Sequence, residues 1–175
     1  MNRNKKIIRN FIILIVWLIL FFNFSMYKLS PISAHEASEK SIHYGPSEIV
    51  HIEDFKEGKF ILCKYENYIS CNTVNKVFGF LWRFGNHPTG IENKKDKAVS
   101  FSCFTSDYCK LFGIINDKSI TRIEVKFNDG TIKEQTEFYD DMFLFTWHYK
   151  EIEIRHSGTL TAYNDKGEIV FTENY

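Results

Sequence analysis

The sequence predicts a mainly β protein: an antiparallel sandwich preceded by a β-meander, one short helix and one N-terminal transmembrane helix. Three observations predict this class. A basic N-terminus runs into a long apolar stretch, short apolar or alternating stretches follow one another from residue 48 onward, and turn residues such as Asn128-Asp129-Gly130 separate them. About ten short strands at such spacing are typical of an antiparallel sandwich or barrel.

The N-terminal segment has the pattern of a membrane anchor. Residues 1–10 hold basic side chains and no acidic one, and residues 11–22 hold no polar side chain. The apolar character continues to residue 29, and about 20 such residues are needed to cross the hydrocarbon core. We therefore expect residues 1–10 to be a cytoplasmic basic tail and residues 11–29 a transmembrane signal anchor, because basic flanks stay on the cytoplasmic side. The remaining chain is then extracytoplasmic, in a single-pass protein of the cell membrane.

A cleaved signal peptide is the alternative. The strictly apolar run, residues 11–22, has the length of a signal-peptide core. Ala34 is a small residue suited to cleavage, but it lies about ten residues beyond Phe24, which is a long way for a signal peptide. No cysteine lies directly after the apolar run, which excludes a lipoprotein-type anchor. After cleavage the chain would be secreted.

Composition and charge exclude other classes. Four of the 22 basic residues precede the apolar run, which leaves 18 against 22 acidic residues in the exported part. This part lacks the basic footprint of a nucleic-acid-binding protein, so we expect no nucleic-acid partner. Aromatic residues make up 17% of the chain, which predicts a folded domain rather than a disordered one. The frequent Asn, Lys and Ile are typical of a low-GC Gram-positive source.

Residues 30–46 predict a short helical linker between the anchor and the β structure. Ser30 or Ser33 can cap the helix, and Ser33 with Glu36 has the spacing of a capping box. Pro46 and the glycine before it end the helix. Its apolar stripe is thin, so we expect it to dock on the edge of the domain.

The rest of the chain divides into two lobes. Residues 47–84 predict a β-meander lobe with a last strand over residues 76–84, and residues 85–97 form the one long breaker-rich segment, which predicts a loop. Residues 98–175 predict the second β lobe, whose clearest hairpin begins with the alternation of residues 120–127. The other strands expected in this lobe cover residues 98–104, 108–115, 131–138, 142–147, 151–155, 160–163 and 168–172.

The second lobe shows a distinctive order of strand and turn motifs. The motifs are residues 113–117, residues 120–127, Asp129-Gly130, Phe143-Leu144-Phe145 and residues 162–170. Over residues 108–172 the chain resembles the immunoglobulin-like β-domain of uncharacterised exported and membrane-anchored proteins of low-GC Gram-positive bacteria. Residues 44–50 and 79–82 are also similar to such proteins. The motifs consist of turn and core residues, so the resemblance implies an immunoglobulin-like fold and carries over no catalytic or ligand residue.

Four cysteines, Cys63, Cys71, Cys103 and Cys109, fall in the exported part. Their even number allows disulfides in an oxidising compartment, and local hairpins would place Cys63 opposite Cys71 and Cys103 opposite Cys109. The alternative is free thiols packed as small apolar side chains, since a domain of this size does not need disulfides. Their spacing does not fit a zinc site, and we expect no metal or cofactor.

Alternating aromatic residues form the main candidate for a binding platform. Phe78, Phe80, Trp82 and Phe84 would share one face of a single strand. We favour burial of this face, where it would anchor the core of the first lobe. An exposed face would instead be a stacking platform for a sugar ring or an apolar peptide, or a second membrane contact.

Titratable side chains form no recognised catalytic motif. The histidines are His35, His43, His51, His87, His148 and His156. They are scattered, and surface or rim positions are the expectation for them. Glu137, Asp140 and Asp141 form the densest acidic spot, which predicts a solvated turn because the ligand pattern of a Ca²⁺ loop is missing. A glycosidase would need a second carboxylate across a sugar-sized cleft.

These observations favour a membrane-anchored extracytoplasmic β-domain that is not an enzyme and that binds a protein partner or a cell-wall glycan. The alternative is a cell-envelope hydrolase. Its catalytic groups would have to come from Glu137, Asp140, Asp141, His148 and His156, with at least two of them meeting in a cleft. A sensor acting through the membrane is a third hypothesis, which would need a partner helix because the cytoplasmic tail is so short.

Overall fold

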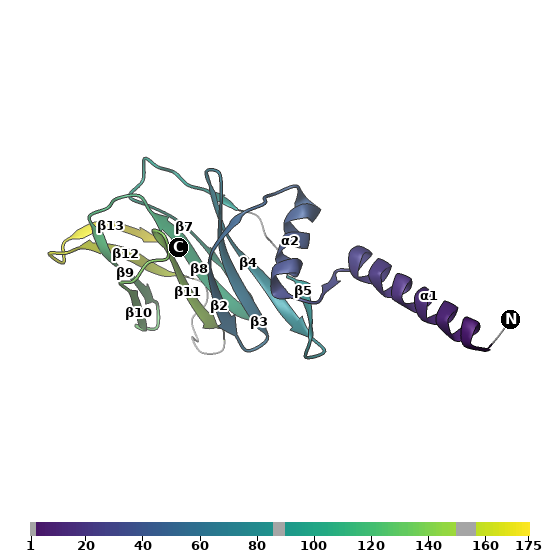
Figure 1. The fold of residues 1–175 in the computed structure, drawn as a ribbon. Helices are drawn as coiled ribbons and strands as arrows, with labels where there is room; N and C mark the ends of the chain where they lie inside the picture. Colours follow the sequence, from purple (N-terminus) through teal and green to yellow (C-terminus); the bar gives the residue numbers. More distant parts are fainter. Residues whose placement is uncertain (1–2, 86–89, 150–156) are drawn as a thin grey trace. The chain divides into compact units, whose positions relative to one another are not determined.

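The computed structural model describes residues 3–85, 90–149 and 157–175 (Figure 1). Its described residues are mainly strands in antiparallel sheets, preceded by two helices, which confirms the predicted fold class. The strand expected over residues 151–155 lies outside the described residues.

The chain forms two compact units. Unit 1 comprises Met1–Pro46, Glu53–Phe60 and Asn72–Pro88, and unit 2 comprises Ser47–Ile52, Ile61–Cys71 and Thr89–Tyr175. Three of the boundaries fall inside long strands, β2 (Glu48–Phe55), β3 (Gly58–Tyr65) and β4 (Tyr68–Val77), and the other two fall after Pro46 and after Pro88.

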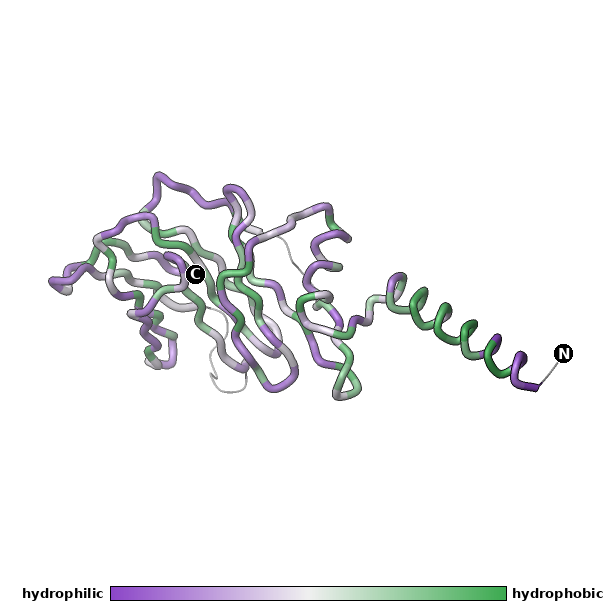
Figure 2. Tube along the Cα trace, viewed as in Figure 1, coloured by the Kyte–Doolittle hydropathy of each residue, from purple (hydrophilic) through white to green (hydrophobic). Residues whose placement is uncertain are grey.

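Helix α1 (Arg3–Phe24) contains the apolar segment and begins unit 1. Its 22 residues span about 33 Å, enough to cross about 30 Å of hydrocarbon. It has the length and the apolar composition to cross a membrane (Figure 2). None of its residues is buried. The helix ends five residues before the predicted residue 29, because Ser25 and Asn23 hydrogen-bond back to the last turn and the chain then enters a strand.

Unit 1 continues with a short strand that joins the first sheet. Strand β1 (Tyr27–Lys28) pairs with β5 (Leu81–Phe84), and this places Lys28 opposite Trp82. The sheet order is β1-β5-β4-β3-β2, and β6 (Ile91–Glu92) also pairs with β4.

Helix α2 (Pro31–Ile42) is the predicted linker helix, and its first cap is Ser30. The Ser30 hydroxyl accepts a hydrogen bond from the Ser33 backbone N–H at 3.1 Å, and proline occupies the first turn. The helix ends at His43, in the left-handed conformation with φ 57°. Its buried face is formed by Ala34, His35, Ser38 and Glu39, so it is mostly polar and not the expected apolar stripe.

Unit 2 contains two further antiparallel sheets. One has the order β10-β9-β12-β13 and the other β11-β8-β7. Their strands are β7 (Val99–Phe104), β8 (Tyr108–Ile115), β9 (Ile120–Phe127), β10 (Ile132–Gln135), β11 (Met142–His148), β12 (Gly158–Asn164) and β13 (Ile169–Asn174). Both sheets contribute to one apolar core, with Leu111 and Phe143 from one and Val125 and Leu160 from the other. This is the layered arrangement of a sandwich.

Turn chemistry in unit 2 agrees with the predicted hairpins. Gly130 has φ 88° between β9 and β10, and the Asp129 carboxylate accepts from the Thr131 N–H at 2.8 Å.

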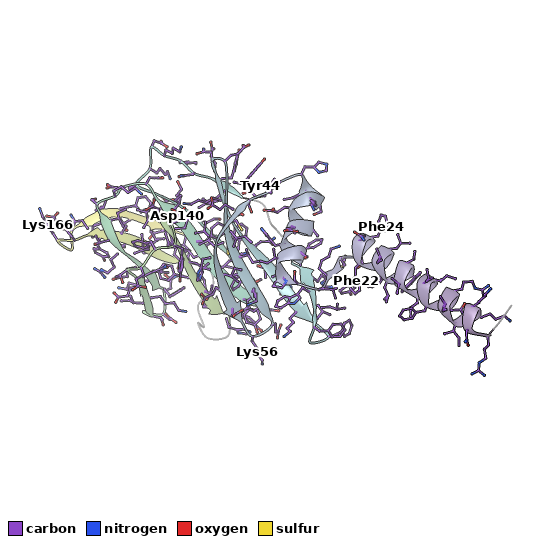
Figure 3. All side chains as sticks on the ribbon, viewed as in Figure 1. Phe22, Phe24, Tyr44, Lys56, Asp140 and Lys166 are labelled. Carbon is purple, nitrogen blue, oxygen red and sulfur yellow. The ribbon has the colours of Figure 1, made fainter. Side chains whose placement is uncertain are left out.

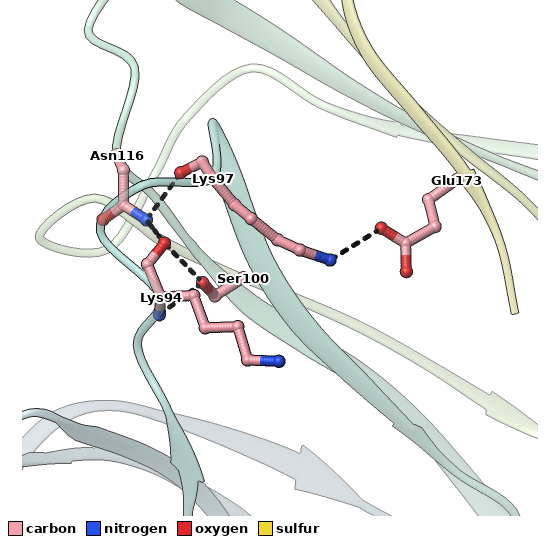
Figure 4. Close-up of polar contacts among 5 residues, drawn as sticks. All are labelled: Lys94, Lys97, Ser100, Asn116 and Glu173. Atoms are coloured by element: carbon pink, nitrogen blue, oxygen red, sulfur yellow. Dashed lines mark hydrogen bonds and ion pairs between the residues drawn. The ribbon is translucent and has the colours of Figure 1, made fainter.

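The loop before β7 is held by Asn116, which directly follows β8. The Asn116 amide donates to the carbonyls of Lys94 and Lys97 in this loop at 3.1 and 3.0 Å (Figure 4). These hydrogen bonds satisfy backbone carbonyls that lie outside the strands and so have no partner in a sheet.

Candidate functional site

Outside α1, the most exposed aromatic side chains of the described residues lie at the turn between β4 and β5. Phe78 is 78% exposed and Phe80 is 65% exposed, although both are large and apolar. Phe78 has φ 50° and Gly79 has φ 78°, two consecutive left-handed residues that reverse the chain. The register resumes with Val77 opposite Leu81. We call Phe78-Gly79-Phe80 the aromatic turn.

The aromatic turn corrects the prediction of one strand over residues 76–84. Because the chain reverses at Gly79, the four aromatic residues do not share the face of a single strand, and burial of Phe78 and Phe80 was the wrong interpretation. Trp82 and Phe84 do lie in a strand, β5, where both are half-buried. The Lys76 amine lies 5.9 Å from the centre of the Trp82 ring, within cation–π range.

A short segment ties the aromatic turn to the end of α1. Ser25 and Met26 alone separate α1 from β1, and β1 pairs with β5. The Lys28 amine donates to the Phe22 carbonyl at 2.6 Å, so this side chain reaches from β1 back to the last turn of the helix. Lysine is favourable there because the C-terminal end of a helix carries partial negative charge. Phe24, the last helical residue, is 87% exposed (Figure 3).

A cavity of about 660 Å³ lies at the same junction. Its lining includes Phe22 and Lys28 on one side and Ser33, Glu36 and Lys40 of α2 on the other. Charges of both signs therefore face this space.

A second candidate cluster is buried between α2 and β4. His35, Ser38, Glu39 and Asn72 are all nearly inaccessible to solvent. The Asn72 amide nitrogen donates to the Ser38 hydroxyl at 2.8 Å and lies 3.0 Å from His35 Nδ1. With Nδ1 as the acceptor, the imidazole proton is on Nε2, which lies 3.3 Å from a carboxylate oxygen of Glu39. We call these four residues the buried polar cluster.

The electrostatics of the buried polar cluster favour a neutral imidazole. Burial lowers the pKa of His35, because the charged form loses its hydration. Glu39 and Glu36 act in the opposite direction, and the lowering by burial is the larger effect. The side-chain oxygen of Asn72 is buried without a hydrogen-bond partner among the described residues.

The cysteines are free thiols in the structure. The pairings considered for Cys63 with Cys71 and for Cys103 with Cys109 are not made. Burial raises the pKa of Cys71 to about 11 and that of Cys103 to about 12, so both stay protonated at neutral pH. Protonated, buried thiols pack as small apolar groups rather than acting as nucleophiles.

A buried lysine lies beside one of these thiols in unit 2. Lys110 donates to the Cys71 carbonyl, and its amine lies 5.8 Å from the centre of the Phe104 ring. Burial lowers the pKa of Lys110. The carbonyl and the ring face offset part of the cost of burying the ammonium group.

The acidic spot of unit 2 is engaged in ion pairs. Asp140 pairs with Lys64, and Asp141 pairs with Lys118. The hydrogen bond from Lys64 lowers the pKa of Asp140, whereas a general acid needs a raised one. Glu137 is exposed, and its backbone carbonyl accepts from the Gln135 side chain at 2.7 Å.

The histidines are dispersed over several elements. His43 ends α2, His51 stacks on Tyr139, and His148 packs edge-on against Tyr108. His87 and His156 lie outside the described residues. Within residues 3–85, 90–149 and 157–175, no three His, Cys, Asp or Glu side chains gather as metal ligands would.

The buried polar cluster was missed by the sequence analysis. Its residues come from α2 and β4, far apart in the chain, and α2 was expected to bury an apolar stripe instead. A usable signal was present in the spacing of His35, Ser38 and Glu39, which at i, i+3 and i+4 share one helix face.

Comparisons of this chain with protein-family models, with curated proteins and with solved structures find no match. The immunoglobulin-like resemblance of residues 108–172 therefore stays a prediction.

Proposed function

We propose that this chain is a membrane-anchored extracytoplasmic β-domain that acts by binding a protein partner or a cell-wall glycan rather than by catalysis. The observation that carries the proposal is the direct connection between α1 and the first sheet. An exposed apolar helix of 22 residues is followed, after two residues, by a strand already paired in that sheet. Such a connection holds the β structure close to whatever surface the helix enters.

The proposed orientation follows from the charges that flank α1. Arg3, Lys5, Lys6 and Arg9 lie in its first turns, and no acidic residue occurs before Glu36. Basic residues near a single span keep their side of it in the cytoplasm. The β structure is then on the outer side of the membrane.

Binding is favoured over catalysis by the state of the reactive groups that the structure describes. Asp140 and Asp141 form ion pairs with lysines. Burial keeps the Cys71 and Cys103 thiols protonated.

Fractionation of cells that express the full chain tests the anchor. We expect the protein to sediment with membranes and to resist extraction by alkaline carbonate. Leu14→Arg with Leu18→Arg should release it, because each arginine at the centre of a span costs about 2.5–3.5 kcal/mol. Leu14→Ile with Leu18→Ile is the matched control and should stay in the membrane. Carbonate extraction of the unaltered chain would contradict the anchor.

Two measurements separate binding from hydrolysis. Chemical crosslinking on intact cells, followed by mass spectrometry, should attach one recurring protein or cell-wall fragment to the exported residues. Purified full-length chain, incubated with isolated cell walls, should release no soluble sugar or peptide. Release that Asp140→Asn or Asp141→Asn abolishes would instead establish the hydrolase.

A further inference from the structure

We propose that the aromatic turn, Phe78-Gly79-Phe80, lies in the lipid interface of the same membrane that α1 spans. It gives unit 1 a second attachment to the bilayer. The inference rests on the anchor of the proposed function and goes beyond it, because it assigns the exposed aromatic residues to lipid rather than to the binding partner.

The turn has the chemistry of an interfacial anchor. Its two phenylalanines are mostly exposed, and the half-buried Trp82 follows within the same hairpin. Lys76 and Arg83 flank the aromatic residues, and residues 73–85 contain no acidic side chain. Aromatic rings favour the boundary between hydrocarbon and headgroups, and basic side chains favour lipid phosphates.

The fold brings this chemistry to the end of α1. The Lys28 amine donates to the Phe22 carbonyl at 2.6 Å, so the end of this side chain lies beside the last helical turn and its backbone lies one lysine side chain away. Its strand partner Trp82 is one strand spacing away, about 5 Å, and Phe80 is two residues further, about 7 Å. A helix end that leaves the hydrocarbon core therefore places the aromatic turn within reach of the headgroup layer, which adds several ångströms on each side of that core.

Lipid fits the turn better than the other occupants considered. A sugar platform combines a ring face with polar groups that bind the hydroxyls, and residues 77–82 offer no such side chain except the Trp82 indole N–H. A bound peptide would find no acidic or basic side chain in the turn itself with which its own charges could pair. A bilayer needs only apolar insertion with cations around it, and this is the arrangement of Phe78 and Phe80 with Lys76 and Arg83.

Two attachments would restrain unit 1 at the membrane. The helix alone leaves rotation about its axis and tilting free, whereas a second contact on a paired strand opposes both. Gly79 suits this role, since its φ of 78° reverses the chain and no heavy atom lies within 4 Å of a Cβ built there. The two phenylalanines then project from a narrow tip.

Photo-crosslinking in proteoliposomes tests the inference. Full-length chain carrying p-benzoylphenylalanine at one position is reconstituted into vesicles of phosphatidylcholine and phosphatidylglycerol, illuminated, and analysed by mass spectrometry for lipid adducts. The test positions are 78 and 80. Position 17, within α1, reports on the anchor. The controls are position 42, which is exposed at the far end of α2, and position 169, which is exposed in β13.

We expect lipid adducts at positions 17, 78 and 80, severalfold above the yield at positions 42 and 169. Adducts at 17 with only background yield at 78 and 80 would overturn the inference and leave the anchor standing. Background yield at 17 as well would overturn the anchor and, with it, the inference. In native membranes, protein adducts at 78 and 80 in place of lipid adducts would overturn the lipid assignment in favour of a protein partner.

Discussion

His35 couples the stability of unit 1 to pH. Burial lowers its pKa in the folded chain, whereas in the unfolded chain it titrates near about 6.5. As the pH falls through that value, the unfolded chain takes up a proton that the folded chain does not, so the free energy of unfolding decreases. The decrease continues until the pH reaches the lower folded pKa. His35 therefore contributes most at neutral pH and above.

The first prediction concerns this pH dependence. Urea unfolding of the full chain, followed by circular dichroism, should show a free energy of unfolding that falls between about pH 7.5 and 5.5, by at most about 1.4 kcal/mol per pH unit from this one group. His35→Gln should flatten that slope. His43→Asn, at an exposed helix end, should leave it unchanged. An unaltered slope in His35→Gln would show that His35 is not the titrating group.

The second prediction concerns Asn72 in the buried polar cluster. Asn72→Ala removes the donor to Ser38 and the contact to His35 Nδ1, and so leaves polar atoms buried around an empty space. We expect a loss of about 1–3 kcal/mol in the free energy of unfolding. Asn174→Ala, at an exposed position, should change it by less than about 0.5 kcal/mol. Equal effects of the two substitutions in urea titrations would contradict the cluster.

Two features at the scale of single residues could not be predicted from the sequence: the state of the cysteines and the buried face of α2. The cysteine types and spacings allowed both disulfides and free thiols, and only the folded positions decide between them. The residues of α2 predicted a helix correctly, whereas the face that it buries depends on Asn72, 34 residues beyond Ser38. Local pattern determines a helix, but its partner is set by the tertiary fold.

At the scale of elements, hairpins were the most predictable features. The alternation of residues 120–127 and the Asp129-Gly130 turn correspond to β9 and its turn, because this turn type requires a left-handed residue that glycine supplies. The strand expected over residues 76–84 failed for the same physical reason. Gly79 also adopts a left-handed conformation, and Phe78, which rarely does, adopts it too. The aromatic residues alternate with period 2 through the turn as they would in a strand, so the sequence pattern did not reveal the turn.

The third prediction compares two glycines in different elements. In β8, a Cβ on Gly113 would lie 2.4 Å from the Phe143 ring and 2.6 Å from the Ser100 carbonyl. Gly113→Ala should therefore cost about 1–3 kcal/mol or more through overpacking. Gly130→Ala meets no neighbouring atom and should cost about 1–2 kcal/mol through its positive φ alone.

Two asparagine variants separate the two causes. Gly130→Asn should recover part of the loss at that turn, because asparagine tolerates the left-handed region, while Gly113→Asn should be at least as destabilising as Gly113→Ala. Thermal unfolding of the four variants gives the comparison. A Gly113→Asn variant that unfolds at the temperature of the unaltered chain would refute the close packing of β7, β8 and β11.

At the scale of the whole molecule, the N-terminal apolar helix, the linker helix and the β-rich remainder were all predictable. Each of them follows from a local pattern: an apolar run, a cap, or an alternation with turn residues. The two compact units were predictable only in part: one boundary, after Pro88, lies in the breaker-rich segment, whereas three others run through β2, β3 and β4, where no local pattern marks them. The aromatic turn combines both cases, since its residues were singled out from the sequence and its exposure was the alternative that the sequence did not favour.

The central claim is that α1 holds the β structure on the outer face of the membrane. The most direct test adds protease to intact protoplasts and detects the chain with an antibody to its C-terminal residues. Before digestion we expect the full-length mass of 20.7 kDa in the membrane fraction, and after digestion we expect loss of the signal while a cytoplasmic marker survives. A C-terminus that is protected until the protoplasts are lysed, or a chain beginning after Ala34 in the medium, would contradict the account.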